Sequence, residues 1–288
     1  MQTEKMDVYQ IVTDKIISQL EQGVVPWRKA WKSGNGGNPA NYASRKAYRG
    51  INWLLLSLSQ YSAPFWLTYK QAAEMGGTVK KGEKGTQVVF WNFVQSKTEK
   101  KANGEAKSFP FAKYYTVFNV EQCEGIGYVA ETVDAANVTP VHDAAEGLIA
   151  AWSDKPQINY GGNRACYSPA LDCVAMPQKE AFDTADNFYS VLFHELTHAT
   201  GHATRLNRLT EQAAFGSSTY AKEELVAELG AAFLGANVGL VNTLEQSAAY
   251  IAGWLKALKD DRRLVLSAAG KAQAAADLIL GNSVAAEQ

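Results

Sequence analysis

Hydrophobic residues recur at helical spacing in three stretches near the beginning of the chain. Over Asp7–Gln22 they fall every three or four positions, which is typical of an amphipathic helix. Ile51–Gln60 is rich in leucine and predicts a second, apolar helix. Thr68 and Gln71 have the spacing of a capping box, so we expect a third helix that begins there and ends at Gly76–Gly77.

Between residues 78 and 120 the pattern becomes strand-like. A basic, glycine-containing turn runs into a β-rich strand that ends near residue 94, and residues 112–120 are typical of a returning strand. The two strands predict a hairpin joined by a polar surface loop at 96–108. Residues 24–50 combine Pro, Gly and Asn with alternating aromatic and basic residues, which indicates a long functional loop.

The second half predicts helices around an extended region. Asp143–Trp152 has the pattern of a short helix, and Arg164–Met176 indicates extended segments. Asp186 or Asn187 would cap the next helix, which includes the apolar positions up to Leu196. The extended region either pairs a substrate backbone by strand addition or is a plain core strand. We therefore expect two domains, 1–122 and 141–288, joined by a linker at 123–140.

Charged and aromatic residues are unevenly divided between these halves. The 288 residues have a net charge of −1, yet residues 1–122 hold 17 Lys and Arg against 9 Asp and Glu, and residues 123–288 hold 11 against 20. The halves therefore carry +8 and −9. Five of the seven Trp also precede residue 123. This asymmetry favours an anionic partner for the first half.

Cations with interspersed aromatic rings suit single-stranded nucleic acid, because cations contact phosphates and rings stack on unpaired bases. No motif for reading duplex sequence is visible. An ordinary core with a solvated basic face fits the composition equally well. The candidate DNA-binding residues are Tyr42, Arg45, Lys46, Tyr48 and Arg49, with Lys80, Lys81 and Lys84 in the glycine turn.

Three cysteines without a C-x-x-C pair indicate neither a disulfide framework nor a thiolate zinc cluster. The polar N-terminus does not resemble a signal peptide, and no run of about 18 apolar residues is present to span a bilayer. We expect a soluble cytoplasmic protein with no membrane partner.

The sequence HELTHATGH at residues 194–202 contains three of the four histidines in the chain. Its HExxH pattern places His194 and His198 one helical turn apart on a single face, where both imidazoles can bind one zinc ion. Glu195 is then placed to take a proton from a water that attacks a carbonyl. Two histidines that fall four residues apart by chance on a buried helix are the alternative. The pattern favours a metal-hydrolase site.

A catalytic zinc usually has three protein ligands and one open position, so a third ligand is needed. His202 is eight residues beyond His194, about 12 Å along a continuous helix, which is too far for the same metal. Thr204 occupies the position of the third histidine in a metzincin. The third ligand must therefore come from elsewhere in the chain.

A helix predicted over Tyr220–Leu234 supplies better candidates. Glu224 and Glu228 share one of its faces, so one carboxylate can bind the metal and the other can orient a ligand imidazole. Glu223 fits a solvated acidic first turn, which the helix dipole favours.

HELTHATGHATRLNR and YAKEELVAELGAAFL, preceded by YRGINWLLL and TYKQAAEMGG, together resemble the ArdC-type antirestriction proteins of conjugative plasmids over nearly the whole chain. The resemblance implies an α+β fold, with a small basic domain that binds single-stranded DNA and a zincin-like metallopeptidase domain. It also implies that the protein protects incoming plasmid DNA from host restriction. On this resemblance His194, His198 and Glu224 would bind zinc or another divalent transition metal, and Glu195 would be the general base. Glu228, on the same helix face as Glu224, is then the carboxylate that would orient a ligand imidazole.

Two functions stay open at this point. The protein is either a working protease that cuts a host protein, or a non-catalytic DNA-binding shield whose metal site is structural. An intact Glu195 favours the protease, because a structural zinc needs no general base and usually has four protein ligands.

Overall fold

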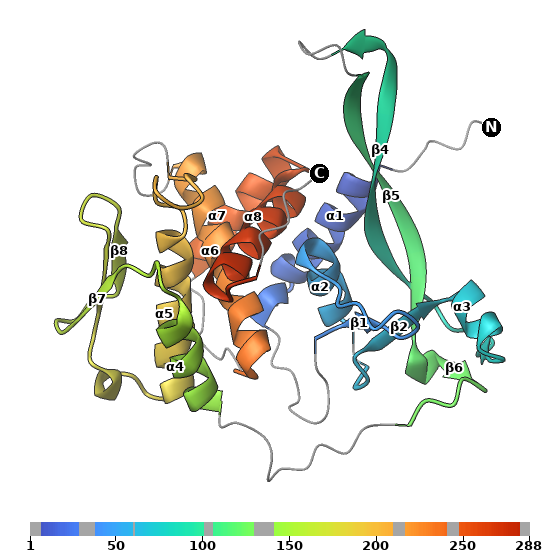
Figure 1. Ribbon diagram of the computed structural model, residues 1–288, viewed down its shortest axis with the longest axis horizontal. Coiled ribbons are helices and arrows are strands. Elements are labelled where there is room, and N and C mark those ends of the chain that lie inside the picture. The colour runs from blue at the N-terminus through green and yellow to red at the C-terminus, as the bar shows by residue number, and fades with distance from the viewer. Residues whose placement is uncertain are drawn as a thin grey trace.

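The structure, a computed structural model, describes residues 7–28, 38–59, 61–100, 106–129, 141–209, 217–240 and 248–282. Figure 1 shows an N-terminal part that carries a long β-hairpin, beside a helical C-terminal part with a small sheet on its outer side. Helices and mixed sheets occur together, so the predicted α+β class is confirmed.

The N-terminal part contains a four-stranded sheet with the order β1-β2-β5-β4. β1 runs parallel to β2, and the remaining neighbours are antiparallel. A separate two-stranded sheet pairs β3 with β6. The elements are α1 (Val8–Glu21), the 3-10 turn η1 (Pro26–Arg28), β1 (Ala40–Asn41), α2 (Gly50–Ser57), β2 (Phe65–Thr68), α3 (Tyr69–Glu74), β3 (Thr78–Val79), β4 (Thr86–Lys100), β5 (Ala106–Asn119), the 3-10 turn η2 (Val120–Gln122) and β6 (Cys123–Glu124).

The C-terminal part places helices against a three-stranded sheet with the order β7-β9-β8, in which β8 is an edge strand. Helix α5 packs on β8 and β9 and on the long helix α6. The elements are α4 (Val141–Ala151), β7 (Gln157–Tyr160), β8 (Cys166–Ser168), β9 (Cys173–Met176), the 3-10 turn η4 (Lys179–Ala181), α5 (Ala185–Ala199), α6 (Ser218–Val238), α7 (Ala248–Asp260) and α8 (Leu264–Ile279).

Side-chain caps set the starts of several helices. The predicted capping box of α3 is present, with the Thr68 hydroxyl accepting from the backbone of Gln71. Helix α5 begins earlier than the sequence indicates. Its N-cap is Thr184, whose hydroxyl accepts from the backbone N–H of Asn187, and neither Asp186 nor Asn187 has this role.

The hairpin is longer than predicted. The sequence predicts a loop at 96–108, but β4 and β5 pair from Thr86↔Val117 to Lys100↔Ala106 with one irregularity, and residues 101–105 lie outside the described residues. In Figure 1 this ribbon projects beyond the rest of the sheet. The sequence of this segment has no alternation of apolar and polar residues, which is the pattern by which a half-buried strand is predicted. The polar composition of this segment therefore predicts a loop where the described residues form strands.

One hydrophobic core joins the two parts of the chain. Trp53 of α2 packs edge-on against Phe233 of α6 with ring centroids 4.9 Å apart, and Trp27 meets Trp254 of α7 at 5.1 Å. Arg49, the N-cap of α2, is ion-paired with the buried Asp277 of α8. Helix α2 is therefore as much a part of the helical core as of the N-terminal sheet.

The predicted linker at 123–140 is partly described. Cys123–Glu124 forms β6 and belongs to the N-terminal part, while residues 130–140 lie outside the described residues. The boundaries at 122 and 141 stay a prediction. Among the helices that the structure describes, none is both long and apolar enough to cross a membrane.

Helices α5 and α6 approach each other unusually closely at Gly230. A Cβ added there would lie 2.4 Å from the Cγ2 atom of the buried Thr197. Only a glycine permits this contact without a shift of the Thr197 side chain or of one helix. The close approach brings the polar residues of α5 opposite those of α6.

Candidate metal centre

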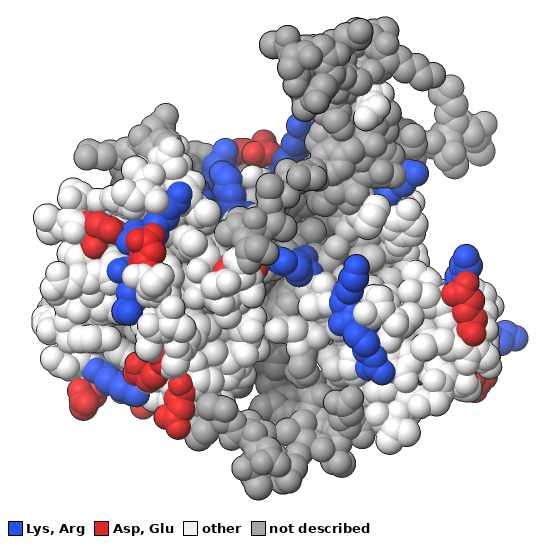
Figure 2. Space-filling model, viewed as in Figure 1, with Lys and Arg blue, Asp and Glu red and all other residues white. Residues whose placement is uncertain are grey.

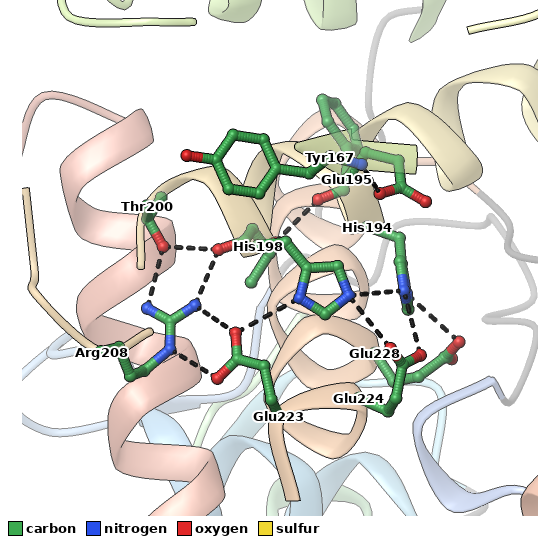
Figure 3. A network of polar contacts seen from close by, with 11 residues as sticks. Tyr167, His194, Glu195, His198, Thr200, Arg208, Glu223, Glu224 and Glu228 are labelled. Atoms are coloured by element: carbon green, nitrogen blue, oxygen red, sulfur yellow. Dashed lines mark hydrogen bonds and ion pairs between the residues drawn. The ribbon is translucent and has the colours of Figure 1, made fainter. Parts of the chain in front are cut away.

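Four polar side chains converge between α5 and α6 (Figure 3). His194 and His198 project from adjacent turns of α5, and Glu224 and Glu228 project from adjacent turns of α6. Both glutamates are buried, with 6% of each residue exposed. A buried carboxylate is costly unless a cation or hydrogen-bond donors face it, so their placement opposite two imidazoles is a specific arrangement.

Three of these side chains have the geometry of a metal site. The Nε2 atoms of His194 and His198 are 3.1 Å apart, and the Glu224 carboxylate lies 3.5 Å from the first and 3.4 Å from the second. Ligands about 2.1 Å from a tetrahedral metal are about 3.4 Å from one another. One ligand atom from each of the three residues lies within 4.8 Å of the others, so they could hold a divalent metal.

The opposite nitrogen of each imidazole faces a second carboxylate. Nδ1 of His194 lies 3.3 Å from Glu228, and Nδ1 of His198 lies 3.3 Å from Glu223. A carboxylate in this position holds the imidazole as the tautomer whose Nε2 lone pair faces the metal. Glu223 is largely buried and not the solvated first-turn residue that the sequence indicated.

Glu195 is held by the edge strand β8. Its Oε2 atom accepts a hydrogen bond of 2.7 Å from the backbone N–H of Tyr167. Figure 3 places this carboxylate on the side of the imidazoles that faces β8, away from Glu223. The contact fixes one oxygen of Glu195, and the second oxygen can take a proton.

Electrostatics within the cluster shift two pKa values in opposite directions. Burial would lower the pKa of His194, but contacts with Glu224 and Glu228 outweigh it and raise that pKa well above its usual value. Burial would raise the pKa of Glu224, but hydrogen bonds with His194 and His198 hold it far below its usual range. Without metal the cluster therefore holds protonated imidazole against ionised carboxylate.

Because the imidazoles are protonated when no metal is bound, metal affinity should depend on pH. The pKa of His198 is also raised, by contacts with Glu223 and Glu224 that outweigh its burial. A metal has to displace any proton from both imidazoles, so its affinity should rise at least about tenfold per pH unit until the higher pKa is passed. The metal-free ion pair stabilises the fold below the unfolded-state pKa of His194, and this stability is lost as the pH rises through the raised value. Chelator competition between about pH 6 and about pH 8 measures the slope. A flat profile would show that no proton leaves on binding.

Predicted DNA-binding residues lie on the loop between β1 and α2. Arg45 has a positive φ of 59° and places its guanidinium 4.6 Å from the ring centres of both Tyr42 and Phe65. Lys46 is exposed, whereas Tyr48 is half-buried against a small apolar cluster. The guanidinium of Arg49 is paired with Asp277 of α8, which ties this loop to the C-terminal helices.

The three predicted lysines lie in the turn that leads into β4. Lys81 and Lys84 are exposed, and the Nζ atom of Lys80 donates to the backbone carbonyl of Glu121 at 2.8 Å. Beyond this turn the hairpin exposes aromatic rings that sequence reasoning overlooked. Phe90 and Tyr115 are 54% and 47% exposed and form an edge-to-face pair.

Two further residues near the metal centre were also missed. Arg208 contacts Glu223 through two hydrogen bonds. The hydroxyl of Tyr220 contacts Glu224, and its pKa is raised mainly by burial, with Tyr250 and Glu224 adding to the shift. The only signal for Arg208 and Tyr220 in the sequence is that they belong to the two motifs, at 194–208 and 220–234, that contain the candidate metal ligands.

The fold and site define the class of this protein, and comparisons with known proteins agree. The family model described as a zincin-like metallopeptidase matches residues 143–271, and the N-terminal domain of anti-restriction factor ArdC matches residues 6–118. The crystal structure of the antirestriction protein ArdC from plasmid R388 is 40% identical, with a TM-score of 0.78 over 98% of this chain and all of that one. The chain therefore belongs to the ArdC-type family of antirestriction proteins.

Other relatives differ in length. Protein y4eC of Sinorhizobium fredii is 37% identical over 94% of this chain and 91% of its own length. Two DNA primases TraC of Escherichia coli are 36% identical over 96% of this chain, which spans only 27% and 20% of their lengths. A second R388 ArdC structure, 39% identical, contains Mn(II).

Proposed function

We propose that this protein protects incoming plasmid DNA from host restriction, with an N-terminal part that binds single-stranded DNA and a zinc-dependent peptidase site that acts on a host protein. Family membership supports the antirestriction role. The observation that carries the peptidase site is the convergence of two imidazole nitrogens and the Glu224 carboxylate, with Glu195 beside them.

Each residue of the site has a defined part in peptide hydrolysis. His194 and His198 would bind zinc through Nε2, and Glu224 would bind it through a carboxylate oxygen. Zinc in this position would polarise the peptide carbonyl and make an attacking water more acidic. Glu195 takes the proton of that water, while the N–H of Tyr167 keeps the carboxylate in place.

The donor set favours a catalytic over a structural metal. Structural zinc sites are usually closed by four protein ligands, whereas three protein ligands leave a position for substrate. Two imidazoles and one carboxylate also accept other divalent metals, in keeping with the Mn(II) in the R388 relative. We propose zinc because two imidazoles and one carboxylate are a usual ligand set of catalytic zinc.

Single-strand binding is supported by exposed rings and cations in the N-terminal part. Tyr115 and Phe90 offer ring surface on the hairpin, and Lys81 and Lys84 lie in the turn before it. In Figure 2 basic side chains lie near the middle of the molecule on the N-terminal part, while acidic and basic side chains lie together at its outer edge and over the helical part. A strand that follows this face would place phosphates near cations and bases on rings.

Replacing Phe90 or Tyr115 with alanine should weaken single-strand binding by about 1–3 kcal/mol, because one stacked base is lost. The salt dependence should stay the same. Lys81→Ala should instead reduce the salt slope by about 0.7, the value for one phosphate contact on a single strand. Fluorescence anisotropy of a labelled oligothymidine over a salt series measures both quantities.

Tyr160→Ala is the matched control, since Tyr160 is a similarly exposed ring in the acidic part. It should bind like the unmodified protein. Duplex DNA of equal length should bind more weakly, because its bases are stacked inside the helix. Equal affinity for duplex and single strand, or a loss in Tyr160→Ala as large as in Tyr115→Ala, would count against this surface.

A further inference from the structure

The segment that follows α5 folds back over the C-terminal end of that helix. The backbone N–H of Leu206 donates to Thr200, and that of Arg208 donates to Gly201, each at 2.9 Å. Asn207 adopts a positive φ of 46°, which reverses the chain direction. A Cβ at Gly201 would lie 3.1 Å from Nη2 of Arg208, so the glycine leaves room for the guanidinium. This reversal of the chain places Arg208 against the C-terminal end of the metal-binding helix α5.

The guanidinium of Arg208 is almost completely engaged. Nη2 donates to the carbonyl of Thr197 at 2.9 Å, and Nη1 donates to the hydroxyl of Thr200 at 3.0 Å. Nε and Nη2 also bind the two oxygens of Glu223, at 3.0 and 2.8 Å. Only 7% of the side chain is exposed. This two-point contact fixes the orientation of the carboxylate as well as its position.

The same Glu223 carboxylate also contacts a ligand of the metal centre. Its Oε1 atom lies 3.3 Å from Nδ1 of His198, whose Nε2 atom faces Glu224 at 3.4 Å. Figure 3 shows this continuous series of contacts from Arg208 to the imidazoles. We propose that Arg208 is a positioning residue for the metal: it fixes Glu223, and Glu223 fixes the His198 imidazole with Nε2 turned toward the ion. This inference rests on the proposed metal site.

An arginine is needed because three carboxylates surround two imidazoles. Glu223 and Glu224 are adjacent on α6, and both contact His198. Without a fixed partner, Glu223 could turn toward the metal in competition with Glu224. The Arg208 fork occupies both oxygens of Glu223 and keeps it as the partner of Nδ1.

Arg205, three residues earlier, provides a matched control. Its side chain is 2% exposed, binds both oxygens of Asp172 at 2.8 and 2.9 Å, and donates to the α5 carbonyl of Ala199 at 3.0 Å. Its burial, its two-point pairing and its contact with the helix end therefore match those of Arg208. None of the contacts described for its guanidinium reaches His194, His198 or Glu224.

The test compares zinc affinity, by chelator competition, in the full-length protein and the variants Arg208→Met, Arg208→Lys, Glu223→Gln and Arg205→Met. Measurements are made well below the melting temperature of each metal-free variant. Arg208→Met and Glu223→Gln should lose about 10–100-fold in affinity, as expected when the partner of a ligand is removed. Arg208→Lys should recover part of the loss. Arg205→Met should lower the melting temperature and leave the affinity unchanged.

Cobalt(II) provides a second readout, because its visible spectrum reports ligand geometry. The spectrum should change in Arg208→Met and stay the same in Arg205→Met. Unchanged affinity and spectrum in Arg208→Met would refute the role of Arg208, and so would equal losses in the two methionine variants. A parent protein that binds no metal would instead contradict the proposed function itself.

Discussion

Replacing Glu224 with alanine should remove most of the metal from the protein. Glu224 is buried and is the only carboxylate that contacts the Nε2 atoms of both imidazoles in the described part of the site. Its loss leaves two protein ligands, whereas catalytic zinc sites use three. Metal content after dialysis, measured by mass spectrometry on protein of confirmed fold, gives the result directly.

Glu228→Ala is the control, because Glu228 lies one turn further along α6 and is equally buried. Its described contact is with Nδ1 of His194, on the side of the ring opposite the metal-binding nitrogen, so affinity should fall only about 10–100-fold. If Glu228→Ala empties the site and Glu224→Ala retains metal, the roles of the two glutamates are reversed.

Glu195→Gln should abolish peptide hydrolysis while it preserves the fold and the metal. The amide oxygen of glutamine can still accept from the N–H of Tyr167, but it cannot take a proton from water. General-base catalysis contributes about 10²–10⁴-fold, so the residual rate should be at least a hundred times lower. Cleavage of fluorescein-labelled casein, with metal content measured on the same sample, checks both expectations.

The same variant decides between the two functions that the sequence leaves open. If Glu195→Gln fails to protect plasmid DNA from restriction in recipient cells, protection requires proteolysis of a host protein. Full protection by this variant would instead favour the DNA-binding shield. Loss of metal in Glu195→Gln would mean that Glu195 has a structural role that the geometry does not indicate.

The sequence was sufficient to predict the two helices of the metal centre. Apolar spacing and the HExxH pattern located α5, and the face shared by Glu224 and Glu228 located α6. It was not sufficient for Glu223, because an acidic first turn is common and the helix dipole explains it without a partner. Its partner Arg208 lies in the segment after α5 that folds back on the helix end, and this reversal depends on Asn207 and Gly201. A chain reversal of this kind produces no periodic pattern in the sequence.

Two other features were beyond the reach of hydrophobic patterning. Polar residues 96–108 predict a loop because strand prediction relies on apolar alternation, which this segment lacks, although its described residues pair as strands. The packing of α2 on α8 was also unforeseen. Leucine-rich α2 is apolar on nearly all sides, so its sequence did not show which neighbours it would contact.

The position of the metal is the central claim, and anomalous diffraction at the zinc absorption edge tests it most directly. Crystals of the full-length protein grown with zinc should show one strong peak per chain, between Nε2 of His194, Nε2 of His198 and the carboxylate of Glu224. Ligand distances should be about 2.0–2.2 Å, with Glu223 and Glu228 outside the coordination sphere. No peak at this position, or a metal bound by Glu223 or Glu228 in place of Glu224, would contradict it.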